Sequence, residues 1–216
     1  MKLYGFWRSL ATFRVRIALN LKGIPFDETM VDLLAGQQFA DGYRGVNPQA
    51  VVPALIENDG APLFQSLAIV EYLDETHPEP PLLPGAPRER ARVRGLAMIA
   101  ACDVHPLIVP RVRNYLGNEF KLDEPAKLKW IRHWFNEGSR AIESHLAGEK
   151  ETGRYCHGDR ITLADVCVVS HAVGAKIFEC DPAPFPTLQR IVADCLKLDA
   201  FARAHPLKQP GASLKH

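Results

Sequence analysis

The sequence predicts a small α/β domain followed by an all-helical domain. Residues 1–80 read as strand, helix, strand, helix, β-hairpin and helix. Residues 78–87, PEPPLLPGAP, contain five prolines, which rule out a helix and favour an extended linker. Beyond them only helical patterns recur, at 90–116, 125–146, 162–178 and 187–201. We therefore expect domains at 1–80 and 88–216, joined by a linker at 81–87.

The first strand runs into a polar corner that is followed at once by a helix. Apolar residues at 3–6 precede the corner at 8–12, and Thr12 is predicted to be the N-cap of the helix. Gly23 is predicted to end the helix as its C′ residue. Ser9 therefore lies between the carboxyl end of a strand and the amino end of a helix. Free backbone N–H groups and the helix dipole stabilise an anion such as a thiolate at this place.

A hairpin and a further helix complete the first domain. Apolar pairs at 55–56 and 63–64 flank an Asn-Asp-Gly turn at 58–60. Ser66 is predicted to be the N-cap of the next helix, whose apolar residues at 68, 69, 72 and 73 repeat at helical spacing.

Composition excludes several classes of function. The 216 residues are 47% hydrophobic and 24% charged, with a net charge of +1, which gives no general reason to expect nucleic acid or an anionic membrane as partner. Residues 1–80 carry 6 Lys and Arg against 10 Asp and Glu, a net charge of −4. The remaining residues carry 20 against 15, a net charge of +5. This excess leaves room for a few cations facing a cleft between the halves.

The cysteines and apolar runs predict a cytoplasmic protein. Five cysteines show no CxxC motif and no paired Cys/His spacing, so we expect reduced, mostly buried thiols and no metal site. No apolar run approaches the roughly 18 residues that a membrane span requires. Because the N-terminus is itself a predicted strand, we expect no cleaved signal.

Several motifs together resemble the zeta class of glutathione transferases, the maleylacetoacetate and maleylpyruvate isomerases. Their signature is Ser-Ser-Cys-x-x-Arg-Val-Arg-Ile-Ala-Leu; here Arg8, Ser9 and residues 14–19 match, while Leu10 and Ala11 replace the second serine and the cysteine. Further matches lie at 36–39, 46–48, 52–53, 65–69, 158–159 and 162–165, so the resemblance covers essentially the whole chain. It implies the glutathione transferase fold, with a thioredoxin-like βαβαββα domain before the helical domain, and a homodimer.

The resemblance also implies a glutathione site. Ser9 would donate a hydrogen bond to the glutathione sulfur, and a cis Val52–Pro53 bond would present Val52 to the extended peptide. Gln65 and Ser66 would hold the γ-glutamyl carboxylate, and Gln38 the other end of the tripeptide. Polar residues at the bend before Pro106 would bind the rest of the tripeptide. Asp103 would do so in its own protomer or across a dimer. His105 would do so unless it is only an interface histidine. The expected glutathione-binding residues are Ser9, Leu10, Ala11, Gln38, Val52, Gln65, Ser66, Asp103 and His105.

A dianionic small-molecule substrate needs cations, for which we expect Arg8, Arg111 and Lys176. Zeta enzymes carry an arginine directly before the phenylalanine that corresponds to Phe178, where this chain has Ile177. The predicted function is glutathione-dependent cis–trans isomerisation of a maleyl-keto acid in aromatic-compound catabolism, with Ser9 and Arg8 as the catalytic residues and glutathione as the cofactor. A general glutathione transferase that conjugates or dehalogenates small electrophiles is one alternative, and a non-catalytic binding module is another.

Other residues of the matching motifs are predicted to be structural. Arg14 and Arg16 are expected to form structural pairs. Residues 162–165, Thr-Leu-Ala-Asp, fit an N-terminal capping box that serves folding of the helical domain.

Overall fold

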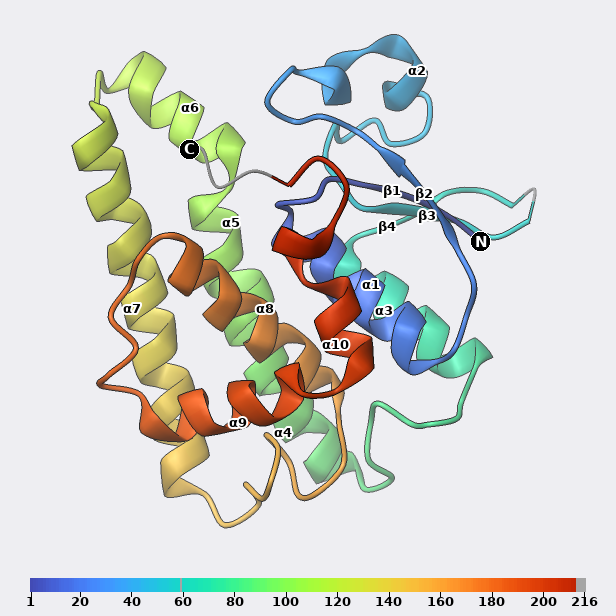
Figure 1. Cartoon of the computed structure of the whole chain (residues 1–216), viewed down its shortest axis with the longest axis vertical. Coiled ribbons are helices and arrows are strands. Elements are labelled where there is room, and N and C mark those ends of the chain that lie inside the picture. The colour runs from blue at the N-terminus through green and yellow to red at the C-terminus, as the bar shows by residue number, and fades with distance from the viewer. Residues whose placement is uncertain (59, 213–216) are drawn as a thin grey trace. The chain divides into compact units, whose positions relative to one another are not determined.

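A computed structural model describes residues 1–58 and 60–212, which form two compact units (Figure 1). One comprises Met1–Pro81 with the segment from Leu198 onward, and the other comprises Leu82–Lys197.

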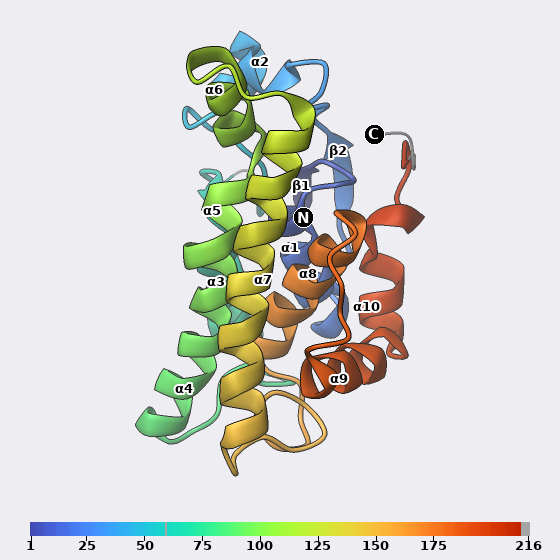
Figure 2. The same ribbon diagram turned by 90° about the vertical axis from the view of Figure 1, so that its left-hand side faces the viewer.

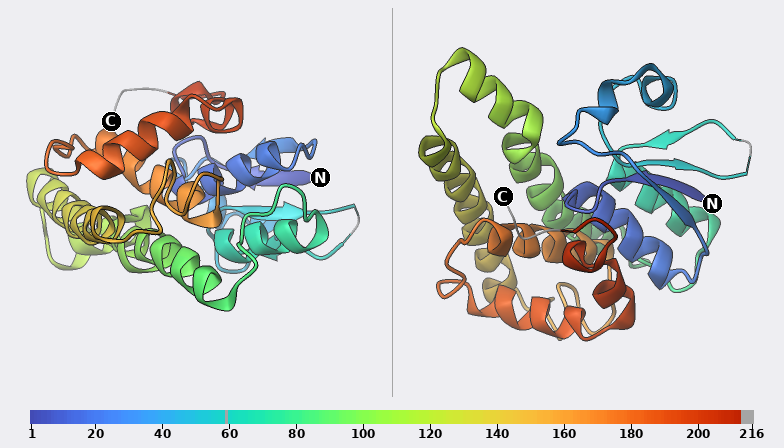
Figure 3. Two further views of the ribbon diagram at one scale, coloured as in Figure 1. Left: turned by 90° about the horizontal axis from the view of Figure 1, so that it is seen from below. Right: turned by 45° about the horizontal axis from the view of Figure 1, so that its top comes forward.

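The first unit is built on a four-stranded sheet in the order β2-β1-β3-β4. Strand β1 (Lys2–Gly5) runs parallel to β2 (Asp27–Met30) and antiparallel to β3 (Ala54–Ile56), which forms a hairpin with β4 (Leu63–Phe64). Helices α1 (Leu10–Leu21) and α3 (Ser66–Thr76) lie side by side on the sheet (Figure 3). A 3-10 turn (Gln37–Phe39) and the short α2 (Asp41–Arg44) lie between β2 and β3. The predicted βαβαββα order is confirmed; Asp59 of the predicted turn lies outside the described residues.

Two predicted N-caps are wrong by one and three positions. The cap of α1 is Ser9, whose Oγ accepts from the Thr12 backbone N–H at 3.1 Å, so Thr12 lies inside the helix. The cap of α3 is Gln65, because Ser66 has already entered the helix and its hydroxyl binds Arg14 instead. Gly23 adopts φ +64° directly after the C-cap Lys22, which confirms the predicted helix end.

The last predicted helix, 187–201, is two helices that belong to different units. Helix α9 (Pro186–Leu196) lies in the second unit, whereas α10 (Asp199–Ala204) and the 3-10 turn Pro206–Lys208 pack in the first. Phe201 is fully buried, and the Asn20 side-chain amide of α1 donates to the Ala200 carbonyl at 3.0 Å. The expectation that 88–216 forms one domain therefore fails at Leu198, because the apolar side of α10 is buried against α1.

The second unit is a bundle of α4 (Pro87–Met98), α5 (His105–Ile108), α6 (Pro110–Glu119), α7 (Glu124–Gly148), α8 (Leu163–Ile177) and α9. Helix α8 is buried along nearly its whole length and contacts α4, α7 and α9, and the long α7 is seen beside α4 and α5 in Figure 2. The predicted helix 90–116 is interrupted twice: by a π-helical turn at Ile99–Val104 and by the extended Val109. The interruptions precede Pro106 and Pro110, whose rings cannot continue a regular hydrogen-bond ladder.

The predicted capping box is confirmed at the start of α8. The Asp165 carboxylate accepts from the Thr162 backbone N–H, the Thr162 hydroxyl and the Cys156 backbone N–H, each at 2.8 Å. Leu82 of the expected linker is buried, and its carbonyl accepts from the Leu163 N–H at 2.8 Å. The linker thus ends at Pro81, and Leu82 is already part of the helical core.

The run Pro87–Glu119 is long and apolar enough to cross a membrane by length and composition alone, which corrects the expectation that no run approaches a membrane span. The π turn and Val109 divide this run, and Val93, Leu96 and Ala97 of its first part are buried. We interpret its first part, α4, as a helix that packs in the core of the second unit. In the described part of the chain the five cysteines are free thiols, and no group of three or more His, Cys, Asp or Glu side chains could hold a metal ion.

Candidate functional site

Ser9 lies where β1 ends and α1 begins. Its side chain is half-buried, and its oxygen already accepts the Thr12 N–H, so the hydroxyl hydrogen remains able to donate elsewhere. The first backbone N–H groups of α1 have no partner within the helix and carry the positive end of its dipole. This corner can therefore hold an anion against one hydroxyl and one helix terminus.

Arg8 places a cation beside this corner. The side chain is half-buried, and burial lowers the pKa of its guanidinium below the ordinary value of an arginine. An arginine side chain nevertheless stays protonated near neutral pH. A substrate anion bound near Ser9 would thus meet a partly desolvated positive charge.

The segment before β3 is held in place by buried polar groups. The Tyr43 hydroxyl and the Asn47 side-chain amide both donate to the Val51 carbonyl, at 2.7 and 2.8 Å. Burial raises the pKa of Tyr43 to about 12, so this hydroxyl keeps its proton and remains a donor. The Val52–Pro53 bond that follows is cis, as the resemblance implies.

The start of α3 carries an unusual backbone conformation. Gln65 adopts φ +68° and ψ 116°, a region that side chains rarely occupy and that recurs at ligand-binding positions. Its side chain is exposed and donates to the Gln49 side-chain oxygen at 2.9 Å. The next residue, Ser66, is buried and accepts from the Arg14 Nε at 3.0 Å. The free N–H groups of the first turn of α3 can receive a carboxylate.

Gln38 is buried with an unsatisfied acceptor. Its Nε2 lies 3.5 Å from the Leu33 carbonyl, while its Oε1 has no hydrogen-bond partner among the described residues. A buried acceptor without a partner is costly, and a donor from a bound ligand would satisfy it.

The strand register brings three of these segments to one edge of the sheet. Tyr4 of β1 pairs with Ala54 of β3, which pairs with Phe64 of β4. Because β3 runs antiparallel to both neighbours, the loop after β1, the loop before β3 and the loop after β4 all leave at the same edge. The first unit therefore gathers five of the expected site residues at one edge of the sheet: Arg8, Ser9, Val52, Gln65 and Ser66.

The other expected residues lie in the second unit. Asp103 is exposed in the π-helical turn, and His105, half-buried, begins α5. Arg111 is exposed in the first turn of α6, and Lys176 is exposed in the last turn of α8. Short π-helical turns inside α-helices frequently occur at functional sites.

Sequence reasoning missed a cation close to the end of α8. The Arg113 guanidinium carbon lies 5.6 Å from the centroid of the Phe178 ring, and Phe178 directly follows Ile177. Arg113 is half-buried, unlike Arg111 and Lys176. Nothing in the spacing of α6 identifies Phe178 as its neighbour, so only the packed structure reveals this position.

Comparison with known proteins shows which family the chain resembles. Residues 1–75 match the family described as glutathione S-transferase, N-terminal domain. The chain is 43% identical to a maleylpyruvate isomerase from Ralstonia over 213 residues, covering 99% of this chain and 100% of the relative. A crystal structure of maleylacetoacetate isomerase from Methylobacterium extorquens AM1, with bound malonate and glutathione, is 52% identical with a TM-score of 0.97, covering 99% of this chain and 100% of that one.

The chain belongs to the zeta class of the glutathione transferases. A further member, a maleylacetoacetate isomerase from Anaeromyxobacter dehalogenans, was solved with bound dicarboxyethyl glutathione and citrate. It is 39% identical with a TM-score of 0.86, covering 98% of this chain and 93% of that one.

Two residues of the serine corner depart from the zeta-class signature. In this zeta-class chain Leu10 and Ala11 replace a serine and a cysteine, and both side chains are buried. They can contribute to an anion site only through their backbone N–H groups at the start of α1. Ser9 is thus the one hydroxyl of the signature that the described corner retains.

Proposed function

We propose that this zeta-class chain is a glutathione-dependent cis–trans isomerase of a maleyl-keto acid, acting in the catabolism of aromatic compounds. Maleylacetoacetate and maleylpyruvate are the two candidate substrates, since full-length relatives bear both names. The observation that carries the proposal is the meeting of Ser9, Val52 and Gln65 at one sheet edge in a chain so similar to these isomerases.

The reaction requires one thiolate and one activated double bond. The glutathione sulfur adds to the cis carbon–carbon double bond, and the electron pair moves onto the conjugated carbonyl as an enolate. The former double bond is now single and rotates. Collapse of the enolate expels the thiolate, which leaves the trans product and regenerates glutathione without net proton transfer.

A relative's bound molecule supports this chemistry. Dicarboxyethyl glutathione, found in the active site of the Anaeromyxobacter dehalogenans enzyme, is a thioether of glutathione with a four-carbon dicarboxylic acid. Addition of a thiol to a butenedioic acid gives such a thioether. An isomerase must form and break this same kind of carbon–sulfur bond.

The proposed glutathione site uses the sheet edge for most of the tripeptide. Ser9 donates to the sulfur and, with the N–H groups of Leu10 and Ala11, favours the thiolate. Val52 pairs with the extended peptide, and Gln65 and Ser66 receive the γ-glutamyl carboxylate at the start of α3. The remaining proposed contacts come from Gln38, Asp103 and His105.

The proposed substrate contacts are cationic. Arg8 beside Ser9 binds a carboxylate and stabilises the enolate, with Arg111 and Lys176 as further candidates. We add Arg113, because its guanidinium lies over Phe178, next to the position where zeta enzymes carry an arginine. The Methylobacterium extorquens relative was solved with malonate, a small dicarboxylate, and glutathione bound.

We further propose a cytoplasmic homodimer, in which Asp103 reaches glutathione of its own protomer or of its partner. The dimer rests on the family alone. Large exposed apolar side chains such as Phe64 and Met98 are compatible with an interface.

General glutathione transferase activity is the second candidate. Ile177 favours it, because an apolar residue replaces an expected cation, and Lys176 is exposed. A non-catalytic module is disfavoured, since it has no need of Ser9, Val52–Pro53 and Gln65–Ser66 together.

The deciding experiment assays maleylacetoacetate, maleylpyruvate and a neutral aromatic electrophile, each with and without glutathione. We expect isomerisation of one or both maleyl-keto acids that requires glutathione and does not consume it. Consumption of glutathione with the neutral electrophile, without isomerisation of either acid, would establish the general transferase instead.

A further inference from the structure

Two buried arginines lie two residues apart on α1. Arg14 and Arg16 are each only 2% exposed. A buried charge is costly unless it is paired and hydrogen-bonded, so both guanidinium groups are expected to have hydrogen-bond partners inside the fold. Residues two apart on a helix point in nearly opposite directions, about 200° around its axis. The two arginines therefore reach different neighbours.

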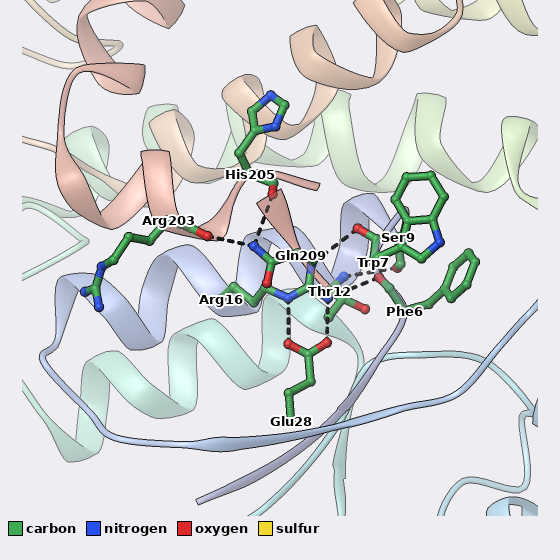
Figure 4. A network of polar contacts seen from close by, with 9 residues as sticks. All are labelled: Phe6, Trp7, Ser9, Thr12, Arg16, Glu28, Arg203, His205 and Gln209. Atoms are coloured by element: carbon green, nitrogen blue, oxygen red, sulfur yellow. Dashed lines mark hydrogen bonds and ion pairs between the residues drawn. The ribbon is translucent and has the colours of Figure 1, made fainter. Parts of the chain in front are cut away.

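Arg16 reaches the loop that carries Arg8 and Ser9. Its Nη2 donates to the Phe6 carbonyl at 3.2 Å, and its Nη1 donates to the Trp7 carbonyl at 3.4 Å (Figure 4). The Phe6 carbonyl also accepts the Ser9 backbone N–H at 3.0 Å. One carbonyl oxygen thus joins the guanidinium directly to the backbone of Ser9.

Glu28 fixes the other side of this guanidinium. Its carboxylate accepts from Arg16 Nε at 2.7 Å and from Nη2 at 2.5 Å, a bidentate pair that holds the planar group in one orientation. The carboxylate also fills the space beside Gly5, where an added Cβ would collide with Glu28 Oε1 and the Thr12 methyl group. The last residue of β1 therefore leaves room for the pair.

Arg14 reaches the start of α3. Its Nε donates to the Ser66 hydroxyl at 3.0 Å in a buried hydrogen bond, although 52 residues separate them. Ser66 follows Gln65, whose left-handed backbone aims the first turn of α3. A contact at Ser66 therefore fixes the N–H groups that face a carboxylate.

We propose that Arg14 and Arg16 are positioning residues that divide the glutathione site between them. Arg16 holds the Phe6–Ser9 loop and so sets the acidity of the bound thiol. Arg14 holds the start of α3 and so sets the affinity for the γ-glutamyl end. Both roles rest on the proposed glutathione-dependent function, but neither requires that the substrate be a maleyl-keto acid.

The test compares Arg16→Lys with Arg14→Lys, each the matched control of the other. Lysine keeps the charge, but its three N–H donors cannot reproduce the four hydrogen bonds that Arg16 makes to Glu28, Phe6 and Trp7. We expect Arg16→Lys to raise the pKa of bound glutathione and lower kcat roughly tenfold, with KM for glutathione within about twofold. Arg14→Lys should raise KM and the dissociation constant for glutathione roughly tenfold and leave the bound thiol pKa unchanged. Equal effects of the two variants on both quantities, or no effect on either, would overturn the proposal.

Two further variants keep the test decisive if a lysine variant does not fold. Glu28→Gln should shift the bound thiol pKa in the direction of Arg16→Lys, and Gly5→Ala should do the same by displacing the Glu28 carboxylate. Asp27→Asn, an exposed change one residue earlier on β2, is the control and should not shift it. If Glu28→Gln, Gly5→Ala and Asp27→Asn all leave the thiol pKa unchanged, the role of Arg16 is refuted.

Failure of the proposed function can be told apart from failure of this inference. The thiol pKa comes from a spectrophotometric titration of bound glutathione, and its affinity comes from calorimetry, so neither needs a substrate. A wild-type protein that binds glutathione with a lowered thiol pKa but isomerises neither acid would refute the isomerase and leave the two arginines fully testable.

Discussion

The Ser9 hydroxyl oxygen lies 3.1 Å from the Thr12 backbone nitrogen, so a single side chain both caps α1 and borders its anion-binding end. The oxygen uses one acceptor site on the Thr12 N–H, and the hydroxyl hydrogen can still donate. Helix capping and thiolate stabilisation are therefore compatible at this residue, and a mutation of it tests both.

Replacing Ser9 with alanine should slow turnover about ten- to hundredfold and raise the pKa of bound glutathione. One hydrogen bond to a charged group is worth about 1.5–3 kcal/mol, which sets this range. The same change should lower the free energy of unfolding by about 1 kcal/mol through loss of the cap. Stopped-flow titration of the thiolate and thermal unfolding measure the two effects separately.

Ser9→Thr is the matched control, since threonine keeps both the cap and the hydroxyl donor. It should retain the low thiol pKa. Loss of stability in Ser9→Ala with an unchanged thiol pKa and rate would reduce Ser9 to a capping residue.

Arg8→Met should distinguish charged from neutral substrates. A maleyl-keto acid carries two carboxylates, so kcat/KM for it should fall by about 2–4 kcal/mol, the scale of losing a transition-state anion donor. Conjugation of a neutral electrophile should change by less than about threefold, or 0.6 kcal/mol. Steady-state kinetics with both substrates give the comparison, and equal losses would make Arg8 a structural residue.

Arg113→Met and Lys176→Met decide which cation replaces the arginine absent at Ile177. We expect the Arg113 variant to raise KM for the dianion roughly tenfold and the Lys176 variant to change it less, because Arg113 is half-buried over Phe178 whereas Lys176 is exposed. Arg132→Met is the control. Its guanidinium is committed to the Phe178 carbonyl at 2.8 Å and to Glu179 at 2.7 Å, so its loss should affect charged and neutral substrates alike. The reverse order of the first two variants would assign the role to Lys176.

Local patterns predicted much of the fold, because they depend on near neighbours in sequence. The succession of strands and helices along residues 1–80, the Gly23 helix end and the Thr162–Asp165 capping box were all predictable from spacing. The caps of α1 and α3 were not, because two polar residues competed for each place. Tertiary contacts decided between them: Ser66 turns to the buried Arg14 instead of capping its own helix.

Contacts between distant segments lay beyond the reach of the sequence. The spacing of 187–201 is consistent with one helix, and only the burial of Phe201 in the first unit explains why it divides. The same limit applies to the site. The resemblance named Ser9, Val52 and Gln65, and Arg16 was expected to form a structural pair. Its partner Glu28, and Arg113 beside Phe178, required coordinates.

Replacing Asp165 with alanine should destabilise the helical unit by about 2–4 kcal/mol. The change leaves the buried N–H groups of Cys156 and Thr162 without their acceptor, and each such orphan costs about 1–3 kcal/mol. Chemical denaturation provides the measurement. Asp159→Ala is the control, because Asp159 is exposed and water can replace its bond to the Arg154 N–H. Equal losses of unfolding free energy in the two variants would show that the buried capping box stabilises the protein no more than an exposed carboxylate does.

Glu149→Gln should destabilise the protein near neutral pH but not in acid. The carboxylate bonds His145 and Arg92, both at 2.5 Å, and these contacts lower the pKa of Glu149 below its ordinary value. A carboxyl group whose pKa is lowered by folding stabilises the protein above its unfolded pKa, about 4.3, and loses this effect as the pH falls through the folded pKa. Because the group is partly exposed, we expect only about 1 kcal/mol, or 2–4 °C in Tm, at pH 7. Thermal unfolding of Glu149→Gln and of the exposed control Glu151→Gln, from neutral pH to about pH 3, should show a gap that closes in acid for Glu149 alone. A gap of constant size would mean that the glutamine substitution acts through packing of the 149–158 loop and not through the charge.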